Sequence, residues 1–452
     1  MTQSVAERYL RLGLQLGRHV EGIVDAYFGP PEPAAAVEAA PPVKPRTLVA
    51  AAEALLDELE DGWLHDQVVG LRTYTGVLAG ESASYADEVE GCYGVRPTYT
   101  EEALFTAAHE RLEELLPGDG PLAQRYERWQ NSILVPTEQV ERTVAAAIEE
   151  ARTWTRGLVE LPAGEGVVLE IVRDKPWLAS CDYLGDLRSR IAVNVDLPMS
   201  AIELLRLTIH ETYPGHHAER SSKEHLLVRG RGLLEETLVL VPTPQSLVSE
   251  GIAELAPYVL LEGDGGAALA AVTHDAGIEL DLAHALAVER AGEPCRWAEV
   301  NAALMLHDAG ASKAEVHAYL ERWGLMTPKL AAQMIRFLTE PTSQTYVITY
   351  PAGRELCRSY VAGDPERFHR LLTEQVRVRD LLGAVASLDI STPPRCSPWC
   401  RSSGLGSQVL DPSATAPEVG AGVPRSKWNL RAIGMSLPTS GTCSTVGTVQ
   451  AH

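Results

Sequence analysis

Residues 202–220 read IELLRLTIHETYPGHHAER, and this stretch predicts both a local fold and a reactive site. Its first half is mostly apolar, which is typical of a buried helix. The pair His210-Glu211 closes that helix, and Pro214 follows three residues later. Because proline lacks the backbone N–H that a helix needs and clashes with the preceding turn, we expect the helix to be disturbed at Pro214.

The pair His210-Glu211 has the chemistry of zincin proteins, in which an imidazole binds zinc and the adjacent carboxylate acts as general base. The usual second histidine lies four residues after the first, but Pro214 occupies that position here. If the chain bulges out at Pro214 and absorbs two residues, His216 takes the place of the second ligand and His217 points away. We therefore predict His210 and His216 as metal ligands and Glu211 as the catalytic base. His217 is predicted to support the site or to contact substrate.

A third ligand is expected from the helical pattern that starts after Pro244. Glu250 and Glu254 are four residues apart, so they share one helical face. Glu250 is predicted to bind zinc directly. Glu254 is predicted to accept a hydrogen bond from the free ring N–H of a liganding histidine. Two histidines and one glutamate leave a fourth position open for water, which is the pattern of catalytic zinc sites.

Two other functions fit the same residues. Two histidines and one carboxylate also hold non-haem iron in oxygenases. The scaffold could also be a binding protein without catalysis. The position of Glu211 beside a ligand favours hydrolysis, because oxygenases need no such base. Metal analysis separates zinc from iron, and peptide turnover separates an enzyme from a binding protein.

The rest of the chain predicts a mainly α fold, a large multi-helix, zincin-like body with a small β-sheet beside the metal-binding helix. Helical periodicity covers residues 3–27, most of 48–160, and most of the chain from 200 to 388. Short β-branched runs at 166–173 and 189–195 predict two strands.

Two segments carry further expectations. The Pro- and Ala-rich stretch 28–45 is expected to be a non-helical surface connection, because each proline removes a donor and restricts its neighbour. The strand at 191–195 lies just before the metal-binding helix. It could form an edge that pairs with an extended peptide, as zincin strands do, or it could be purely structural.

The charge of the chain excludes some classes of partner. There are 61 acidic and 39 basic residues, for a net charge of −22. This argues against nucleic acid and against anionic lipid, both of which need a basic surface. No signal-peptide segment and no apolar run of about 18 residues is found, so no membrane partner is expected. Seven scattered cysteines fit a reducing cytosol, so we expect a cytoplasmic protein. The oligomeric state is not predicted.

Two parts of the chain differ in composition. Residues 1–388 are predicted to form the helical metallopeptidase-like domain, and residues 389–452 a low-complexity tail. Positions 390–452 contain 10 Ser, 7 Gly and 7 Pro without any apolar period, which is typical of disordered chain.

The motif His-Glu-x-x-Pro-Gly-His-His at 210–217, followed by a Glu-Gly helix start, resembles domain-of-unknown-function family 885. This is a bacterial group of mainly helical, zinc-peptidase-like proteins, and the resemblance covers roughly residues 1–388. Ile252 stands where the family usually has tryptophan, and Arg220 lies near the place of a glutamine. Supporting matches are DAYFGP at 25–30, YLG at 183–185 and YPAG at 350–353.

The resemblance implies zinc as the cofactor and Tyr350 as the donor that stabilises an oxyanion beside it. Arg354 lies one helical turn after Tyr350. A surface role is expected for it, and the alternative is that it binds a substrate carboxylate. The sequence therefore predicts a zinc-dependent metallopeptidase acting on short peptides, in which Glu211 takes a proton from water.

Overall fold

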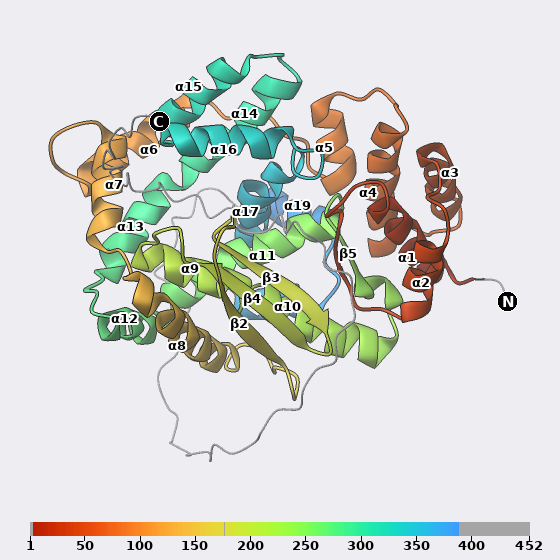
Figure 1. Cartoon of the computed structure of the whole chain (residues 1–452), viewed down its shortest axis with the longest axis horizontal. Helices are drawn as coiled ribbons and strands as arrows, with labels where there is room; N and C mark the ends of the chain where they lie inside the picture. Colours follow the sequence, from red (N-terminus) through yellow and green to blue (C-terminus); the bar gives the residue numbers. More distant parts are fainter. Residues whose placement is uncertain (1–2, 176, 388–452) are drawn as a thin grey trace, which may run out of the picture.

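The computed structural model describes residues 3–175 and 177–387, and the predicted tail at 389–452 lies outside this part of the chain. The described chain is mainly helical with two small sheets, so the predicted fold class is confirmed (Figure 1). The helices that precede the larger sheet are α1 (Val5–Gly17), α2 (Pro31–Ala39), α3 (Pro45–Leu56), α4 (Trp63–Leu78), α5 (Tyr85–Tyr93), α6 (Glu102–Leu115), α7 (Leu122–Ser132) and α8 (Thr137–Thr155).

The strands and the later helices build the part that carries the site. The strands are β1 (Val24–Tyr27), β2 (Gly166–Val172), β3 (Ala179–Gly185), β4 (Arg188–Asn194) and β5 (Leu238–Leu240). The long helices are α9 (Ala201–Glu211), α10 (His216–Lys223), α11 (Pro244–Leu261), α12 (Gly266–Asp275), α13 (Leu282–Gly292), α14 (Trp297–His307), α15 (Lys313–Trp323), α16 (Pro328–Thr339), α17 (Thr349–Val361), α18 (Pro365–Thr373) and α19 (Val378–Ser387). The short helical turns are η1 (Glu224–Arg229), η2 (Leu234–Thr237), η3 (Glu293–Arg296) and η4 (Tyr346–Ile348).

The N-terminal segment differs from the prediction in two places. The expected helix over 3–27 ends at Gly17, and the residues after it form the short strand β1. The stretch 28–45, expected to be non-helical, contains the helix α2. This expectation was wrong because Pro31 is the first residue of the helix. The N–H of a residue at that position has no partner within the helix, so proline costs no hydrogen bond there. The alanines that follow favour the helix.

The larger sheet contains three strands in the order β2-β4-β3. Strand β4 is parallel to β2 and antiparallel to β3, so both of its edges are already paired. The idea that residues 191–195 form an edge for an extended peptide is therefore wrong. Strand β3 was not predicted, because its sequence ASCDYLG lacks β-branched residues and does not alternate in polarity.

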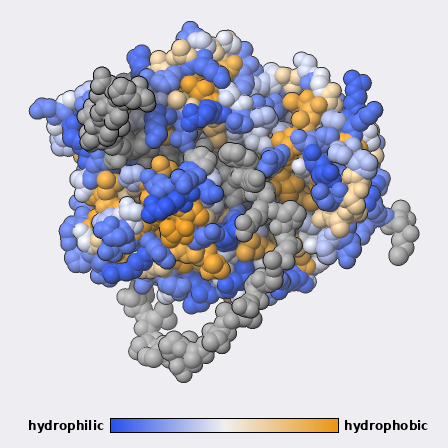
Figure 2. Space-filling view, in the orientation of Figure 1, coloured by the Kyte–Doolittle hydropathy of each residue, from blue (hydrophilic) through white to orange (hydrophobic). Residues whose placement is uncertain are grey.

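The sheet lies beside the helices that carry the histidines, as predicted. Strand β3 contacts both α9 and α10, and β4 contacts α10. Helices α1, α3 and α4 pack together on one side of the molecule, while α6 and α13 pack together on the opposite side (Figure 1). None of the described helices has the length and apolar character needed to cross a membrane. The face in Figure 2 is largely hydrophilic, with hydrophobic residues in separate groups, one of them over the larger sheet.

Helix α11 is the centre of the fold. All of its residues are buried, including the two glutamates that were predicted to serve the site. It packs most extensively against α17, and the two backbones touch at Gly251 and Gly353. A Cβ atom on Gly251 would lie 2.3 Å from the carbonyl oxygen of Gly353. This close approach brings Arg354 of α17 to 3.6 Å from Glu254.

Adding a methyl group at this crossing is expected to destabilise the protein strongly. In Gly251→Ala the new carbon meets backbone atoms, which cannot rotate away, so the helices must separate. We expect a loss of about 3 kcal/mol or more in the free energy of unfolding, measured by urea denaturation. Gly383→Ala is the matched control, because Gly383 lies in a helix with open space around it. The control substitution should leave the free energy of unfolding unchanged or raise it slightly. An equal loss of stability in both variants would show that the close contact between α11 and α17 is not the cause.

Candidate metal centre

Three predicted ligands come together at one buried point. His210 ends α9, His216 begins α10 and Glu250 lies in α11, and their ligand atoms all lie within 4.8 Å of one another. The Nε2 atom of His210 is 3.5 Å from Oε2 of Glu250, and Nε2 of His216 is 3.4 Å from Oε1. The two imidazole rings meet edge to face. Two histidine nitrogens and a carboxylate around one point are the donor set of a catalytic zinc site.

The chain reaches this geometry by ending one helix and starting another. Helix α9 stops at Glu211, Thr212 leaves the helical region, and α10 begins at His216. The expected bulge inside a single helix is therefore replaced by a break between two helices. Gly215 makes the break possible, because a Cβ atom there would lie 2.0 Å from the carbonyl oxygen of His210. Without a side chain at Gly215, α10 can begin directly against the last turn of α9.

The carboxylate of Glu211 lies beside the ligands and is completely buried. Neither of its oxygens has a hydrogen-bond partner among the described residues. Burial raises the pKa of this carboxyl group, while the two neighbouring imidazoles act in the opposite direction. A raised pKa makes the carboxylate a stronger proton acceptor than an exposed glutamate, which suits a general base.

Further polar atoms around the same point lack partners among the described residues. Buried polar atoms in proteins are nearly always hydrogen-bonded. A group of unpartnered donors and acceptors at one place therefore fits a site for a cation and water. The atoms concerned are His210 Nε2, His216 Nε2, Glu250 Oε2, both carboxylate oxygens of Glu211 and the hydroxyl of Tyr350.

A hydrogen-bonded chain orients His216. Its Nδ1 atom is 3.3 Å from the hydroxyl oxygen of Ser249, and that hydroxyl donates to Oε2 of Glu219 at 2.6 Å. Because the single hydroxyl proton is used on Glu219, Nδ1 of His216 carries the hydrogen and donates to Ser249. Nε2 is then free to bind a metal ion. The sequence analysis did not identify Ser249 or Glu219, although both lie within three residues of a ligand.

Glu254 lies next to His210, as predicted, but most of its contacts are with arginines. Its Oε1 atom is 3.8 Å from Nδ1 of His210, which is longer than a hydrogen bond. Its Oε2 atom accepts a hydrogen bond of 2.8 Å from Arg296, with Arg354 at 3.6 Å and Arg206 at 3.8 Å. Burial opposes ionisation of Glu254, but the cations around it outweigh burial and lower its pKa to about 2.

Two tyrosines, Tyr346 of η4 and Tyr350 in the first turn of α17, lie near the ligand Glu250. The hydroxyl of Tyr346 donates a 2.7 Å hydrogen bond to Oε1 of Glu250, a contact that the sequence analysis missed. The ring of Tyr350 lies 5.6 Å from that of Tyr346, and its hydroxyl has no partner among the described residues. Burial raises the pKa of both phenols well above the usual value, so both stay protonated and can donate. Tyr350 therefore offers an unused hydrogen-bond donor beside Tyr346, near enough to Glu250 and Glu211 for their charges to raise its pKa further.

His217 lies in a separate buried cluster. Its Nδ1 atom is 2.7 Å from the hydroxyl of Ser189 in β4, and its Nε2 atom is 3.0 Å from Oε2 of Glu165. Tyr213 and Arg152 also bind Glu165. A serine, a histidine and a glutamate in a row resemble a nucleophile triad, but all three are buried, so no substrate reaches the hydroxyl. The cluster therefore fastens α10 to the sheet.

This cluster predicts a specific loss of stability in acid. Burial raises the pKa of Glu165, but hydrogen bonds from its neighbours outweigh burial and lower it to about 2. Because this value is below that of the unfolded chain, near 4.5, the stabilisation is present above pH 4.5. It is lost as the pH falls toward 2. Glu165→Gln should therefore be less stable than the parent at pH 7, and the difference should shrink as the pH falls from 4.5 to 2.

Urea unfolding at a series of pH values measures this difference. Glu150→Gln, on the exposed side of α8, is the control and should follow the parent at every pH. A Glu165→Gln difference that stays constant from pH 7 to pH 2 would contradict the assignment.

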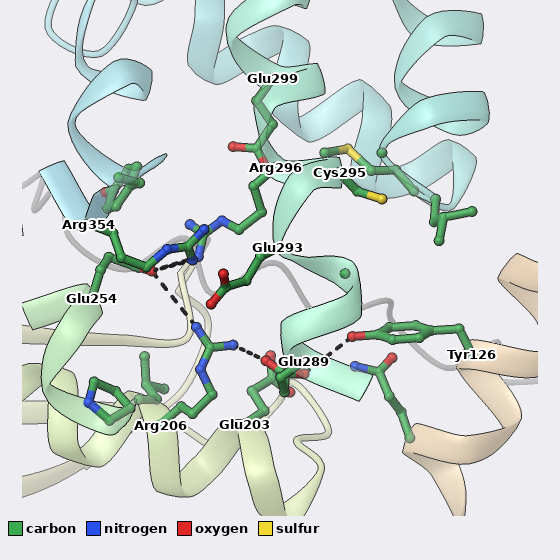
Figure 3. A pocket seen from close by; sticks show the side chains of 18 of the residues that line it. Tyr126, Glu203, Arg206, Glu254, Glu289, Glu293, Cys295, Arg296, Glu299 and Arg354 are labelled. Carbon is green, nitrogen blue, oxygen red and sulfur yellow. Dashed lines mark hydrogen bonds and ion pairs between the residues drawn. The ribbon is translucent and has the colours of Figure 1, made fainter. Parts of the chain in front are cut away.

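A cavity of about 160 Å³ adjoins the metal centre. His210 and Tyr350 line the side nearest the ligands. Figure 3 shows Arg206, Arg296 and Arg354 reaching into the same region from three different elements. Among the described residues the glutamates that line the cavity are Glu203, Glu254, Glu289, Glu293 and Glu299.

No family model matches this chain, and no curated protein does. Two solved structures align with much of it. One, named "putative lipoprotein", is from Colwellia psychrerythraea, with a TM-score of 0.48 and 15% identity over 75% of this chain and 62% of that chain. The other, named "putative lipoprotein of unknown function", is from Shewanella oneidensis, with a TM-score of 0.45 and 13% identity over 83% of this chain and 69% of that chain. This chain thus spans less than two thirds of the Colwellia structure.

Proposed function

We propose that this protein is a zinc-dependent hydrolase, most specifically a metallopeptidase that cleaves short peptides. The observation that carries the proposal is the buried convergence of His210, His216 and Glu250 with the unpartnered carboxylate of Glu211 beside them. The resemblance of the motif at 210–217 to family 885 supports the same reading.

The ligands His210, His216 and Glu250 would hold the ion. An ion held there would supply Lewis acidity and would lower the pKa of a bound water to about 7. In this proposal Glu211 accepts the proton from the attacking water and passes it to the leaving amine. The neutral phenol of Tyr350 donates a hydrogen bond to the oxygen that becomes negative. Tyr346 and Ser249 fix the orientations of Glu250 and His216.

The carboxylate of Glu211, which has no hydrogen-bond partner among the described residues, bears on both alternatives. An iron oxygenase would use the same three ligands, but it has no need of a buried, unpartnered carboxylate next to them. A binding protein without catalysis would retain a pocket but would not require Glu211 to stay unpaired. A buried carboxylate without partners lowers stability, and such a residue in a site is typical of catalysis.

Metal analysis and peptide turnover test the proposal together. The purified protein should contain about one zinc ion per chain, and a chelator should remove both the zinc and the hydrolysis of a mixed-peptide library. Adding zinc back should restore both. Iron in place of zinc would favour the oxygenase, and stoichiometric zinc without any peptide turnover would favour the binding protein.

A further inference from the structure

We propose that the cavity beside the metal centre binds the free C-terminal carboxylate of the substrate through Arg354. On this reading the protein releases one residue from the C-terminal end of short peptides. The inference rests on the proposed hydrolase function and adds the cleavage end to it.

The spacing along α17 supports this assignment. Tyr350 and Arg354 are four residues apart, so they project from the same side of the helix about 6 Å apart. Both line the cavity that His210 borders. An extended peptide advances about 3.5 Å per residue. A substrate whose scissile carbonyl lies at Tyr350 therefore brings its next carboxylate within reach of the Arg354 guanidinium.

Arg354 has unused hydrogen-bonding capacity. Its side chain is buried, with a relative exposure of 3%, and its Nε and Nη1 atoms have no hydrogen-bond partner among the described residues. The neighbouring Oε2 of Glu254 is 3.6 Å away and already accepts from Arg296. A guanidinium N–H binds a carboxylate through a strong, charge-assisted hydrogen bond. Because Arg354 lines the cavity, either unpartnered nitrogen can donate to a carboxylate that enters it.

The other charged groups of the cavity are largely occupied. Arg206 forms an ion pair with Glu289, which also accepts from Tyr126. Glu293 accepts a 2.9 Å hydrogen bond from Arg358. Burial raises the pKa of Glu299 to about 7, so this carboxyl group is only partly ionised at neutral pH and attracts an amine weakly. Glu203, the remaining acid of the wall, also takes part in an interaction. With these acids engaged, Arg354 is the group left to recognise a charged end of a peptide.

The volume of the cavity suits one residue beyond the scissile bond. A cavity of about 150 Å³ in another protein holds a benzene molecule, and the present one measures about 160 Å³. A single amino-acid residue is of this size, and Arg354 lies in the wall around it.

Three blocked peptides test the cleavage end on the intact protein. N-acetyl-trialanine has a free carboxylate, its C-terminal amide has none, and trialanine amide has only a free amine. We expect kcat/KM for N-acetyl-trialanine to exceed that for its amide by at least about 30-fold, the effect of a buried charged hydrogen bond. If kcat/KM for either amide lay within about threefold of that for N-acetyl-trialanine, the inference would be overturned. The proposed hydrolase function would not be affected by that result.

Binding without turnover separates the two proposals. In the Glu211→Gln protein, calorimetry should detect binding of N-acetyl-trialanine but no binding of its amide. In the double variant that also carries Arg354→Gln, this difference in binding should disappear. Arg354→Lys should restore it in part, and Arg290→Gln should leave it unchanged, because Arg290 bonds Glu262 outside the cavity. A binding difference without hydrolysis by the parent would overturn the hydrolase alone. Equal binding of acid and amide, or no binding of either, would overturn the carboxylate site.

Discussion

Replacing Glu211 by glutamine is expected to lower kcat at least about 100-fold while the zinc content stays the same. Glutamine keeps the size and polarity of the side chain but cannot accept a proton from water. The residue is not one of the three converging ligands, so metal binding should survive. Steady-state kinetics and metal analysis on the same preparation measure both quantities.

The same substitution should also make the metal-free protein more stable. The carboxylate is buried without a hydrogen-bond partner among the described residues, and burial raises its pKa. At neutral pH the folded state therefore bears the cost of holding this charge, and an uncharged amide removes it. Thermal unfolding in the presence of a chelator should show an equal or higher midpoint for Glu211→Gln. Glu150→Gln is the control for the loss of one acidic residue in this stability measurement. In the kinetic measurement, a rate of hydrolysis by Glu211→Gln close to that of the parent would reject the role of Glu211 as general base.

Zinc binding should be lost in His210→Ala and His216→Ala and retained in His217→Ala. The first two histidines lie in the three-residue cluster, whereas His217 binds Ser189 and Glu165. Mutating a residue that only orients a ligand usually lowers metal affinity by ~10–100-fold. Removing a ligand itself should lower zinc affinity by more than that. His217→Ala should instead lower the free energy of unfolding by about 3 kcal/mol, because it leaves Glu165 buried with one partner fewer.

Ser249→Ala provides an intermediate case for the same experiment. It removes the hydroxyl that orients His216 but leaves every ligand in place. Its zinc affinity, measured by competition with a coloured chelator, should fall by ~10–100-fold. The expected order of zinc affinity is therefore parent, then Ser249→Ala, then His216→Ala. Zinc loss in His217→Ala with normal zinc in His216→Ala would show that the wrong histidine was chosen.

The features that the sequence predicted well are local ones. The helix that ends at Glu211 follows from its apolar approach, and strands β2 and β4 follow from their β-branched residues. The disturbance of the helix near Pro214 follows from the chemistry of proline, although its form, a break after Glu211 instead of a bulge, was not predicted. These signals act over a few residues, so they can be interpreted without knowing what the rest of the chain contacts.

The features that were missed depend on contacts between distant segments. Tyr346 binds Glu250 across 96 positions, and Ser249 binds Glu219 across 30. No spacing rule connects residues so far apart. The burial of Arg354 was missed for the same reason. A surface role was expected for this arginine, and only the packing of α17 on α11 brings it next to Glu254. Strand β3 was missed for the related reason that its pairing with β4, rather than its own composition, makes it a strand.

The contact between Gly251 and Gly353 constrains how the site could be redesigned. The two backbones are in direct contact there, so a shift of α17 along α11 would bring a side chain of one helix against the backbone of the other. The ligand Glu250 on one helix and the substrate-facing Tyr350 and Arg354 on the other therefore share a single rigid frame. An engineer who shifts α17 to admit a larger substrate would also displace the metal ligand. Changes in substrate preference are better sought in η3 and α13, which border the cavity without supplying a ligand.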